Sequence, residues 1–310
     1  DGNIWFGDGD VVGRVRPTGV IRTFGGSGVE SVDGLTPGPG TDLCFAGSGS
    51  GLASITMAGD ITTHEGAVHI VRPDEVIAAA GGGLWFSAQR DSLSAQAIGA
   101  MTTSGEAEGF GGQPACRTST PCFHHWGGRD LTEAPAGNLW FLDTENQIGR
   151  VTPDGQVSAW TRPGSEFGAL TVGADGNIWI TGRDRGPSVG RVFRLRTDTG
   201  GLRAFAVPGS FRTHDVVTGA DGNVWFGAGG DRLGRITPAG VVTTFGAASV
   251  TGVGDLVTGP DGNVWFAAPS RIGRITPAGR IRTFVHPGLQ SATALTAGPD
   301  GHAWFLTLAH

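Results

Sequence analysis

The sequence is poor in charged residues and contains neither lysine nor tyrosine. Charged residues make up 16% of the 310-residue chain, against about 25% in ordinary globular domains, and the formal net charge is −6. Every basic residue is an arginine and the arginines form no run, so the electrostatic footprint of a nucleic-acid-binding protein is missing. No apolar stretch approaches the roughly 18 residues that cross a bilayer, which excludes a membrane-spanning helix.

Cysteine is scarce as well, with three residues in the chain. Cys116 and Cys122 are separated by five residues in a polar, proline-containing segment, and we expect them to form a small disulfide loop. A disulfide favours a secreted or extracytoplasmic location. The chain begins with Asp1-Gly2-Asn3, inside a turn motif, so we expect a mature or trimmed product whose targeting segment is not visible.

Glycine is abundant instead, with 56 residues beside 17 prolines. Such a content without a pattern would indicate low complexity. Hydrophobic residues nevertheless make up 38% of the chain, including 9 Trp and 16 Phe, and the glycines recur at intervals. The sequence therefore predicts a folded chain with many turns.

The glycines belong to an internal repeat. The segment Asp261-Gly262-Asn263-Val264-Trp265-Phe266 recurs along the chain, and a second block, Ile272–Phe284, follows seven of its eight copies. Positions equivalent to the tryptophan are 5, 44, 85, 140, 179, 225, 265 and 304. Position 44 is a cysteine, which we interpret as a buried small hydrophobe.

Each repeat is typical of four short strands. In the seventh copy we expect strands at Asp255–Thr258, Asn263–Ala267, Arg271–Thr276 and Arg280–Phe284, joined by Pro-Asp-Gly and Pro-Ala-Gly turns. Four strands per about 40 residues indicate a blade of an all-β propeller. We therefore expect one domain over 1–310 with seven four-stranded antiparallel blades, the last first strand (Ala294–Gly298) completing the blade opened by Asp1–Phe24. An eight-bladed ring with two incomplete blades is the alternative.

At these residues the sequence resembles the virginiamycin B (streptogramin) lyase family, repeat by repeat over essentially the whole chain. The resemblance implies a β-propeller and a metal-assisted elimination that opens a cyclic depsipeptide at its ester bond. It also implies catalytic residues on the face formed by the loops that precede the first strands and join the second and third strands.

Only one of the family's four catalytic positions keeps its residue. The resemblance places the family's first catalytic histidine at His214, while Gly254 stands in place of the second. Gly252 occupies the position of one glutamate, and Ala268 or Pro269 that of the other. The catalytic motif is largely absent, so whether the chain is an enzyme stays open.

Acidic residues open many of the predicted first strands, where the propeller resemblance puts them near the mouth of a central channel. This set, with its neighbouring basic residues, comprises Asp33, Asp74, Glu75, Arg129, Asp130, His214, Asp215 and Asp255. Clustered carboxylates suit a divalent cation such as Mg²⁺ or Ca²⁺, and they raise one another's pKa for proton transfer. Alternatively, each carboxylate caps the amides of its own loop.

The least repetitive segment is an insert at about 111–128, between the third and fourth repeats. It holds His124, His125 and Trp126, whose side chains suit a metal, a sugar or a planar ligand. A disulfide-braced loop with packed aromatics is the alternative interpretation. We expect His64 and His69 to be solvated surface residues.

The arginine of the recurring Gly-Arg pair is predicted to be structural, lying over the tryptophan of the neighbouring strand. Its copies are Arg14, Arg150, Arg191, Arg235 and Arg274.

Three functions remain. The first is an exported, monomeric propeller that binds a small molecule, a glycan or a protein through the first-strand residues and the insert. The second is a lyase with a relocated site that uses His214 and Asp215 with His124 or His125. The third is a structural module of a larger protein.

Overall fold

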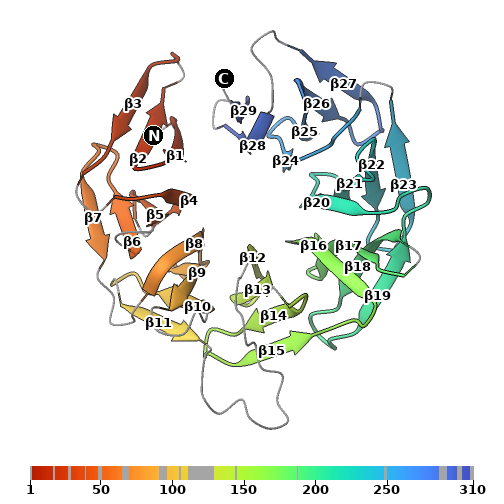
Figure 1. Cartoon of the computed structure of the whole chain (residues 1–310), viewed down its shortest axis with the longest axis horizontal. Helices are drawn as coiled ribbons and strands as arrows, with labels where there is room; N and C mark the ends of the chain where they lie inside the picture. The colour runs from red at the N-terminus through yellow and green to blue at the C-terminus, as the bar shows by residue number, and fades with distance from the viewer. Residues whose placement is uncertain are drawn as a thin grey trace. The chain divides into compact units, whose positions relative to one another are not determined.

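The structure is a computed structural model that divides into two compact units, Asp1–Thr161 (unit 1) and Arg162–His310 (unit 2). It describes residues 2–16, 18–26, 29–38, 40–47, 51–64, 70–90, 96–104, 106–110, 129–143, 145–186, 188–247, 250–285, 292–298 and 302–307. Over these residues the regular structure is all β (Figure 1). The described part of the chain has no helix long and apolar enough to cross a membrane. The insert at 111–128, with Cys116 and Cys122, lies outside the described residues.

Unit 1 contains one three-stranded and three four-stranded antiparallel sheets within its described residues. Their strands are β1 (Ile4–Asp8), β2 (Val11–Val15) and β3 (Ile21–Phe24); β4 (Val32–Pro37), β5 (Leu43–Gly47), β6 (Gly51–Ile55) and β7 (Ile61–His64); β8 (Ile70–Ala78), β9 (Leu84–Arg90), β10 (Gln96–Met101) and β11 (Ala107–Phe110); and β12 (Arg129–Ala134), β13 (Asn138–Leu142), β14 (Ile148–Val151) and β15 (Val157–Trp160).

Unit 2 contains three four-stranded sheets and a two-stranded one within its described residues. Their strands are β16 (Ser165–Val172), β17 (Ile178–Asp184), β18 (Val189–Leu195) and β19 (Leu202–Ala206); β20 (Thr213–Thr218), β21 (Val224–Ala228), β22 (Arg232–Ile236) and β23 (Val242–Gly246); β24 (Leu256–Thr258), β25 (Val264–Ala268), β26 (Arg271–Ile275) and β27 (Ile281–Phe284); and β28 (Ala292–Ala297) and β29 (Ala303–Thr307).

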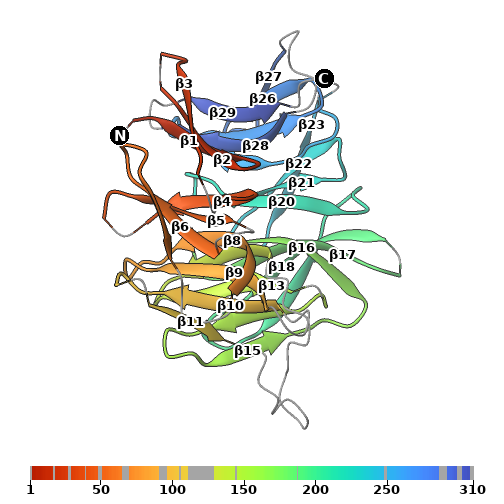
Figure 2. The same ribbon diagram turned by 60° about the vertical axis from the view of Figure 1, so that its left-hand side comes forward.

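The expected strands of the repeat are confirmed, with bounds that differ by about one residue. Within each unit the first strands of successive sheets contact one another, and the fourth strands lie at the outer side (Figure 1). Figure 2 shows β4–β7 stacked on the next sheet of unit 1. In unit 2, β28 pairs with β29, so residues 303–307 take the place beside the last first strand. The number of blades stays a prediction.

Glycine makes both the turns and the strand crossings possible. Gly262, between the first two strands of its sheet, has a φ of 76°, which side chains rarely adopt. On β26, a Cβ at Gly273 would overlap the ring of Phe266 on the paired strand β25. At Gly273 a side chain would therefore collide with the phenylalanine ring that covers the backbone of this residue.

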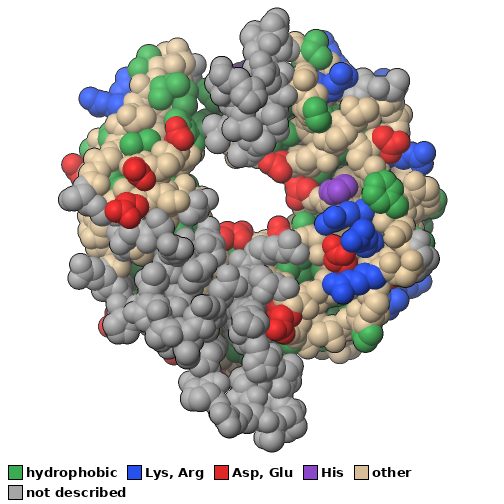
Figure 3. All heavy atoms as spheres, in the orientation of Figure 1, with side chains coloured by type: hydrophobic (Ala, Val, Ile, Leu, Met, Phe, Trp, Pro, Cys, Tyr) green, Lys and Arg blue, Asp and Glu red, His purple; other side chains and the backbone are tan. Residues whose placement is uncertain are grey.

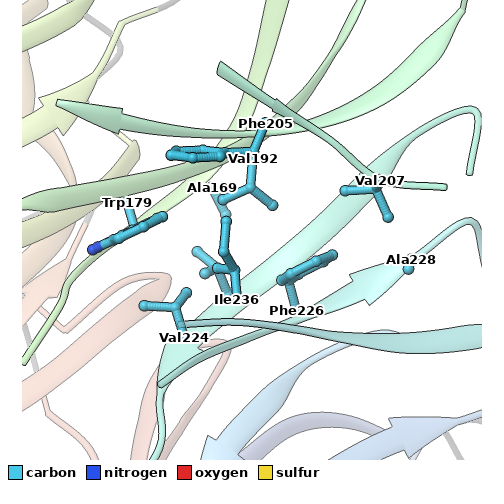
Figure 4. Packing of buried hydrophobic residues seen from close by; sticks show 10 residues of the cluster. Ala169, Trp179, Val192, Phe205, Val207, Val224, Phe226, Ala228 and Ile236 are labelled. Atoms are coloured by element: carbon cyan, nitrogen blue, oxygen red, sulfur yellow. The ribbon is translucent and has the colours of Figure 1, made fainter. Parts of the chain in front are cut away.

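The hydrophobic core lies between successive sheets. In unit 2, Trp179 and Phe205 of one sheet pack with Val224, Phe226 and Ile236 of the next (Figure 4). Trp179 and Phe226 are at most 1% exposed, and burial of such side chains stabilises the fold by roughly 2–3 kcal/mol each. Each sheet therefore depends on its neighbour for a complete core.

A stack of tryptophan, arginine and a second aromatic ring recurs on the sheets. In β20–β23, the guanidinium carbon of Arg235 lies 5.4 Å from the Trp225 ring centre and 5.5 Å from that of Phe245. The two rings are 5.5 Å apart and nearly parallel, at 26°. Equivalent stacks are Trp5–Arg14–Phe24, Trp140–Arg150–Trp160, Trp179–Arg194–Phe205 and Trp265–Arg274–Phe284.

The stacked arginine also joins neighbouring sheets. Its Nη1 donates a hydrogen bond to a backbone carbonyl in the turn between the third and fourth strands of the next sheet. The pairs are Arg14 to Met57 (2.6 Å), Arg194 to Pro238 (2.7 Å) and Arg235 to Pro277 (2.7 Å). Each of these three arginines thus stabilises its own sheet by a cation–π contact and the next sheet by a hydrogen bond.

The predicted structural role is confirmed for Arg14, Arg150, Arg235 and Arg274, whereas Arg191 was the wrong residue in its repeat. Arg194, three residues later, faces Trp179 across the strand pair and lies over its ring. Arg191 forms an ion pair with Asp184 instead, with Nη2 2.6 Å from Oδ2. The repeat is longer here, so β17 and β18 have seven residues each and the arginine that faces the tryptophan falls later.

Candidate functional site

Several of the predicted first-strand residues lie where the pairing of the first and second strands shifts. Register shifts fall between Val32 and Gly34, between Arg129 and Thr132, and between Thr213 and Val216. A β-bulge leaves backbone amides outside the ladder and turns side chains away from their alternating directions. These shifts enclose Asp33, Asp130, and the pair His214-Asp215. The sequence repeat had no signal for the bulges.

Two of the predicted carboxylates bind backbone amides of the next first strand. Asp215 Oδ2 accepts a hydrogen bond from the Leu256 amide of β24 at 2.6 Å, and its Oδ1 accepts one from Val216 at 2.8 Å. In unit 1, Glu75 Oε1 accepts one from the Leu131 amide of β12 at 3.1 Å. These acids therefore connect neighbouring sheets, and Asp215 in addition binds the adjacent amide of its own segment, as the capping alternative had it.

Burial raises the pKa of Asp215 above its usual range. The two amide hydrogen bonds oppose this shift, and the nearby charge of Asp255 adds to it. Asp215 therefore accepts hydrogen bonds that hold the backbone in place, and its pKa is shifted. A shifted pKa indicates a functional site only where other functional groups lie nearby.

His214 stands next to Asp215 on β20 and has a different environment. Burial, and after it the positive charge of Arg212, lowers the pKa of its imidazole. Its Cβ lies 3.2 Å from the position that a Cβ would take at Gly227 of β21, so this glycine makes room for the histidine. No hydrogen bond joins the imidazole to another described residue. A neutral, half-buried imidazole is able to accept a proton or a ligand hydrogen bond.

An ionic network that the sequence did not predict lies close to His214 in unit 2. Glu166 Oε2 accepts hydrogen bonds from Nε (3.0 Å) and Nη2 (2.8 Å) of Arg183, and Arg212 Nη2 lies 3.6 Å from Glu166 Oε1. Figure 3 shows basic, acidic and histidine side chains together on this face. Arg183, with Arg212 and Arg185, holds the pKa of Glu166 below its usual range. The longer spacing of this repeat was the only sequence signal.

The remaining predicted site residues fall partly outside the described residues. His124, His125 and Trp126 are not described, nor are the side chains of Asp33, Asp74 and Arg129. Within the described part of the chain, no three His, Cys, Asp or Glu side chains form a group that could hold a metal ion. The divalent cation stays a prediction.

The positions expected to hold the other catalytic residues are packed against one another. Gly252 has a φ of 62°, and a Cβ there would lie 2.8 Å from Cδ of Pro269. The amide of Gly254 donates a hydrogen bond to the carbonyl of Ala267 at 2.9 Å. Glutamate at Gly252 would therefore require this segment to move, whereas a Cβ at Gly254 would lie 3.7 Å from the Ala267 carbonyl oxygen, which is an ordinary contact.

Comparison with known proteins finds the same family that the sequence resembles. Residues 161–310 match the model of the Virginiamycin B lyase family. This range is nearly that of unit 2 and includes His214. No curated protein sequence matches the chain at a significant level.

Solved structures extend the likeness to the whole chain. A streptogramin B lyase is similar with a TM-score of 0.66 and 23% identity, covering 88% of this chain and 89% of that one. Virginiamycin B lyase from Staphylococcus aureus gives 0.66 and 22%, covering 89% and 91%. A catalytically inactive variant of the latter, crystallised with quinupristin, gives 0.67 and 21%, covering 98% and 94%. The predicted all-β propeller fold is confirmed, and these identities establish the fold alone.

Proposed function

We propose that the chain is a propeller that binds a small molecule, a glycan or a protein on the face that carries the loops before its first strands. In unit 2 this face brings together His214 and Arg212 with the Glu166–Arg183 ion pair. The imidazole of His214 carries the proposal, because it is half-buried and forms no hydrogen bond to a described residue, so it is available to a ligand.

The neighbouring charges indicate what the ligand carries. Arg183, Arg185 and Arg212 all act on the single carboxylate of Glu166. Arginines in excess of their acidic partner favour an additional carboxylate, sulfate or phosphate group. We therefore expect an anionic small molecule or an acidic glycan to bind better than a neutral one.

A panel of acidic and neutral glycans and small carboxylates, screened by thermal shift and measured by calorimetry, tests the proposal. We expect an acidic member to bind, and Arg212→Gln and His214→Gln each to weaken it at least tenfold. Arg280→Gln removes the same charge from an exposed turn and is the matched control. Binding that is unchanged in both site variants, or no binding by any member, would exclude this function at this face.

A second candidate is a lyase, supported by the similar folds and by the one matched histidine, His214. A neutral imidazole is competent to take up a proton, and Asp215 of the same strand is its proposed partner. The test is turnover of quinupristin with added Mg²⁺, followed by mass spectrometry, in the parent and in His214→Ala. Absence of turnover by the parent excludes this substrate, and turnover unchanged in His214→Ala excludes this residue.

The location also remains a proposal. We infer a secreted or extracytoplasmic protein from the expected bridge between Cys116 and Cys122. Intact mass after alkylation, with and without prior reduction, tests the bridge. Three alkylated cysteines in the unreduced protein would remove its basis.

A further inference from the structure

The sheet β4–β7 of unit 1 has lost all three members of the recurring stack. Cys44 faces Ser54 across β5 and β6, as Trp225 faces Arg235 across β21 and β22. Likewise Leu52 faces His64 where Leu233 faces Phe245. The three replacements therefore lie together on one sheet. Cysteine and serine are smaller than the tryptophan and the arginine of the other sheets, and histidine is more polar than phenylalanine.

A cavity of about 210 Å³ occupies this region, between β4–β7 and the next sheet. It is lined by Asp42, Cys44, Ser54, His64, Met101, Thr102, Thr103 and Ser104. Since one water takes up roughly 30 Å³ of liquid, the cavity has room for several waters or one small organic molecule. It reaches the surface beside the exposed turn that contains Thr102 and Ser104.

The arginine that Ser54 replaces shows which hydrogen-bond donor is missing from the cavity. In other sheets the guanidinium donates to a turn carbonyl of the next sheet, at the residue that follows a threonine, as Arg235 does at Pro277. In the sheet next to β4–β7 the corresponding turn begins at Thr102, so the corresponding carbonyl is that of Thr103. Ser54 provides no guanidinium for it, and its Oγ lies 2.9 Å from Nε2 of His64 instead.

The charge around the cavity is also suited to a cation. Asp42 lines it and is close enough to Cys44 for its charge to contribute to the raised pKa of the thiol. Among the described residues that line the cavity there is no arginine. A cation bound there would thus have the carboxylate of Asp42 as its partner.

We propose that this cavity is a binding site for a small planar organic cation of the amidinium or guanidinium class. The cationic group takes the place of the missing arginine and donates to the Thr103 carbonyl, with Asp42 as its counter-charge. The planar part lies against Cys44 and Met101, where the tryptophan ring lies in other sheets. The binding is noncovalent and independent of the face around His214.

Calorimetry or ligand-observed NMR with benzamidine tests the site, with benzamide as the neutral analogue of the same shape. We expect saturable binding of benzamidine at least tenfold tighter than that of benzamide. Asp42→Asn should bring benzamidine down to the affinity of benzamide. Glu108→Gln, which removes one exposed charge from the adjoining sheet, is the matched control and should leave the affinity unchanged.

Filling the cavity gives the decisive variant. In Ser54→Arg, and in Ser54→Arg combined with Cys44→Trp, the protein supplies its own guanidinium, so benzamidine binding should be lost. If the double variant does not fold, the single variant provides the same readout. Equal affinity for benzamidine and benzamide, no binding of benzamidine, or full binding by a folded Ser54→Arg variant would each overturn the proposal.

Discussion

The sheets β4–β7 and β20–β23 have the same four-stranded antiparallel order but different interiors. In β20–β23 the stack of Trp225, Arg235 and Phe245 fills the space next to the following sheet. In β4–β7 the same positions hold Cys44, Ser54 and His64, and a cavity adjoins them. The backbone ladder is maintained in both, so the stack strengthens a sheet without being required to form it.

The comparison also indicates where a repeat protein is able to acquire a new site. Stability in such folds is spread over repeats and their interfaces, so one repeat tolerates a loss that the others compensate. Cys44 still contributes to the core, being 2% exposed and packed with Val76 and Leu84 of the next sheet. The inner part of the β4–β7 interface is thus retained while its outer part contains the cavity.

The largest expected difference concerns the tryptophan position. Trp225→Ala should lower the free energy of unfolding by about 3–5 kcal/mol, because a fully buried ring is removed and leaves a cavity. Cys44→Ala should cost about 1 kcal/mol, since it removes one atom beside a cavity that already exists. Urea denaturation followed by far-UV circular dichroism measures both. Equal losses would show that the two sheets do not differ in this way.

Alkaline pH should destabilise β4–β7, the sheet that carries Cys44. Burial, and to a lesser degree Asp42, raises the pKa of Cys44 from 9.0 to about 11. Because the thiol holds its proton more tightly in the folded state, its contribution to stability is complete below pH 9. It is lost as the pH rises toward 11, by up to about 2 kcal/mol.

The chain is suited to this measurement because it contains neither lysine nor tyrosine, so cysteines are its only side chains that ordinarily titrate between pH 9 and 11. Urea midpoints between pH 8 and 11 should fall in the parent and stay level in Cys44→Ala. The same fall in both proteins would assign the effect to Cys116 and Cys122.

Much of the fold could be predicted because the same residue types recur at the turns and core positions of each repeat. Gly262 and Trp265 recur in register, and their roles in turn and core follow from residue type. Arg194 was missed because the longer strands of its repeat moved the arginine that faces the tryptophan by three residues. A repeat thus predicts strand order well, and register poorly where its spacing changes.

The candidate sites were harder to predict because they depend on contacts between sheets. The bond from Asp215 to the Leu256 amide joins residues 41 positions apart, and the bulge that permits it is a property of the backbone. His64 was expected to be a solvated surface residue, and this was wrong: it is half-buried and bonded to Ser54. The position of His64 beside the cavity is recognised only when the three residues that depart from the repeat, Cys44, Ser54 and His64, are considered together.

A smaller effect is expected where the two sheets differ at the glycine of the third strand. Phe226 faces Gly234 in β20–β23, while Phe45 faces Ala53 in β4–β7. Gly234→Ala should cost about 1–3 kcal/mol, because the new methyl group overlaps the Phe226 ring. Ala53→Gly should cost about 0.5–1 kcal/mol through backbone entropy. Calorimetric melting measures both, and a neutral Gly234→Ala would show that the ring moves away freely.

The smallest effects are expected at the position of the arginine. Arg235→Ala removes the cation–π contact with Trp225 and the 2.7 Å hydrogen bond to Pro277, which should cost about 1–2 kcal/mol. The low end is expected because Arg235 Nε is buried and has no hydrogen-bond partner in the described structure. Ser54→Ala, which removes only the contact with His64, should cost about 0.5–1 kcal/mol.

Urea midpoints distinguish these two variants when Arg280→Ala, at an exposed turn, serves as the control with an expected change within about 0.5 kcal/mol. A larger loss for Ser54→Ala than for Arg235→Ala would mean that the Ser54–His64 pair is itself a structural replacement for the stack. The cavity beside it would then be a by-product of repacking. The predicted order, with the arginine above the serine, instead leaves the pair free to respond to a ligand.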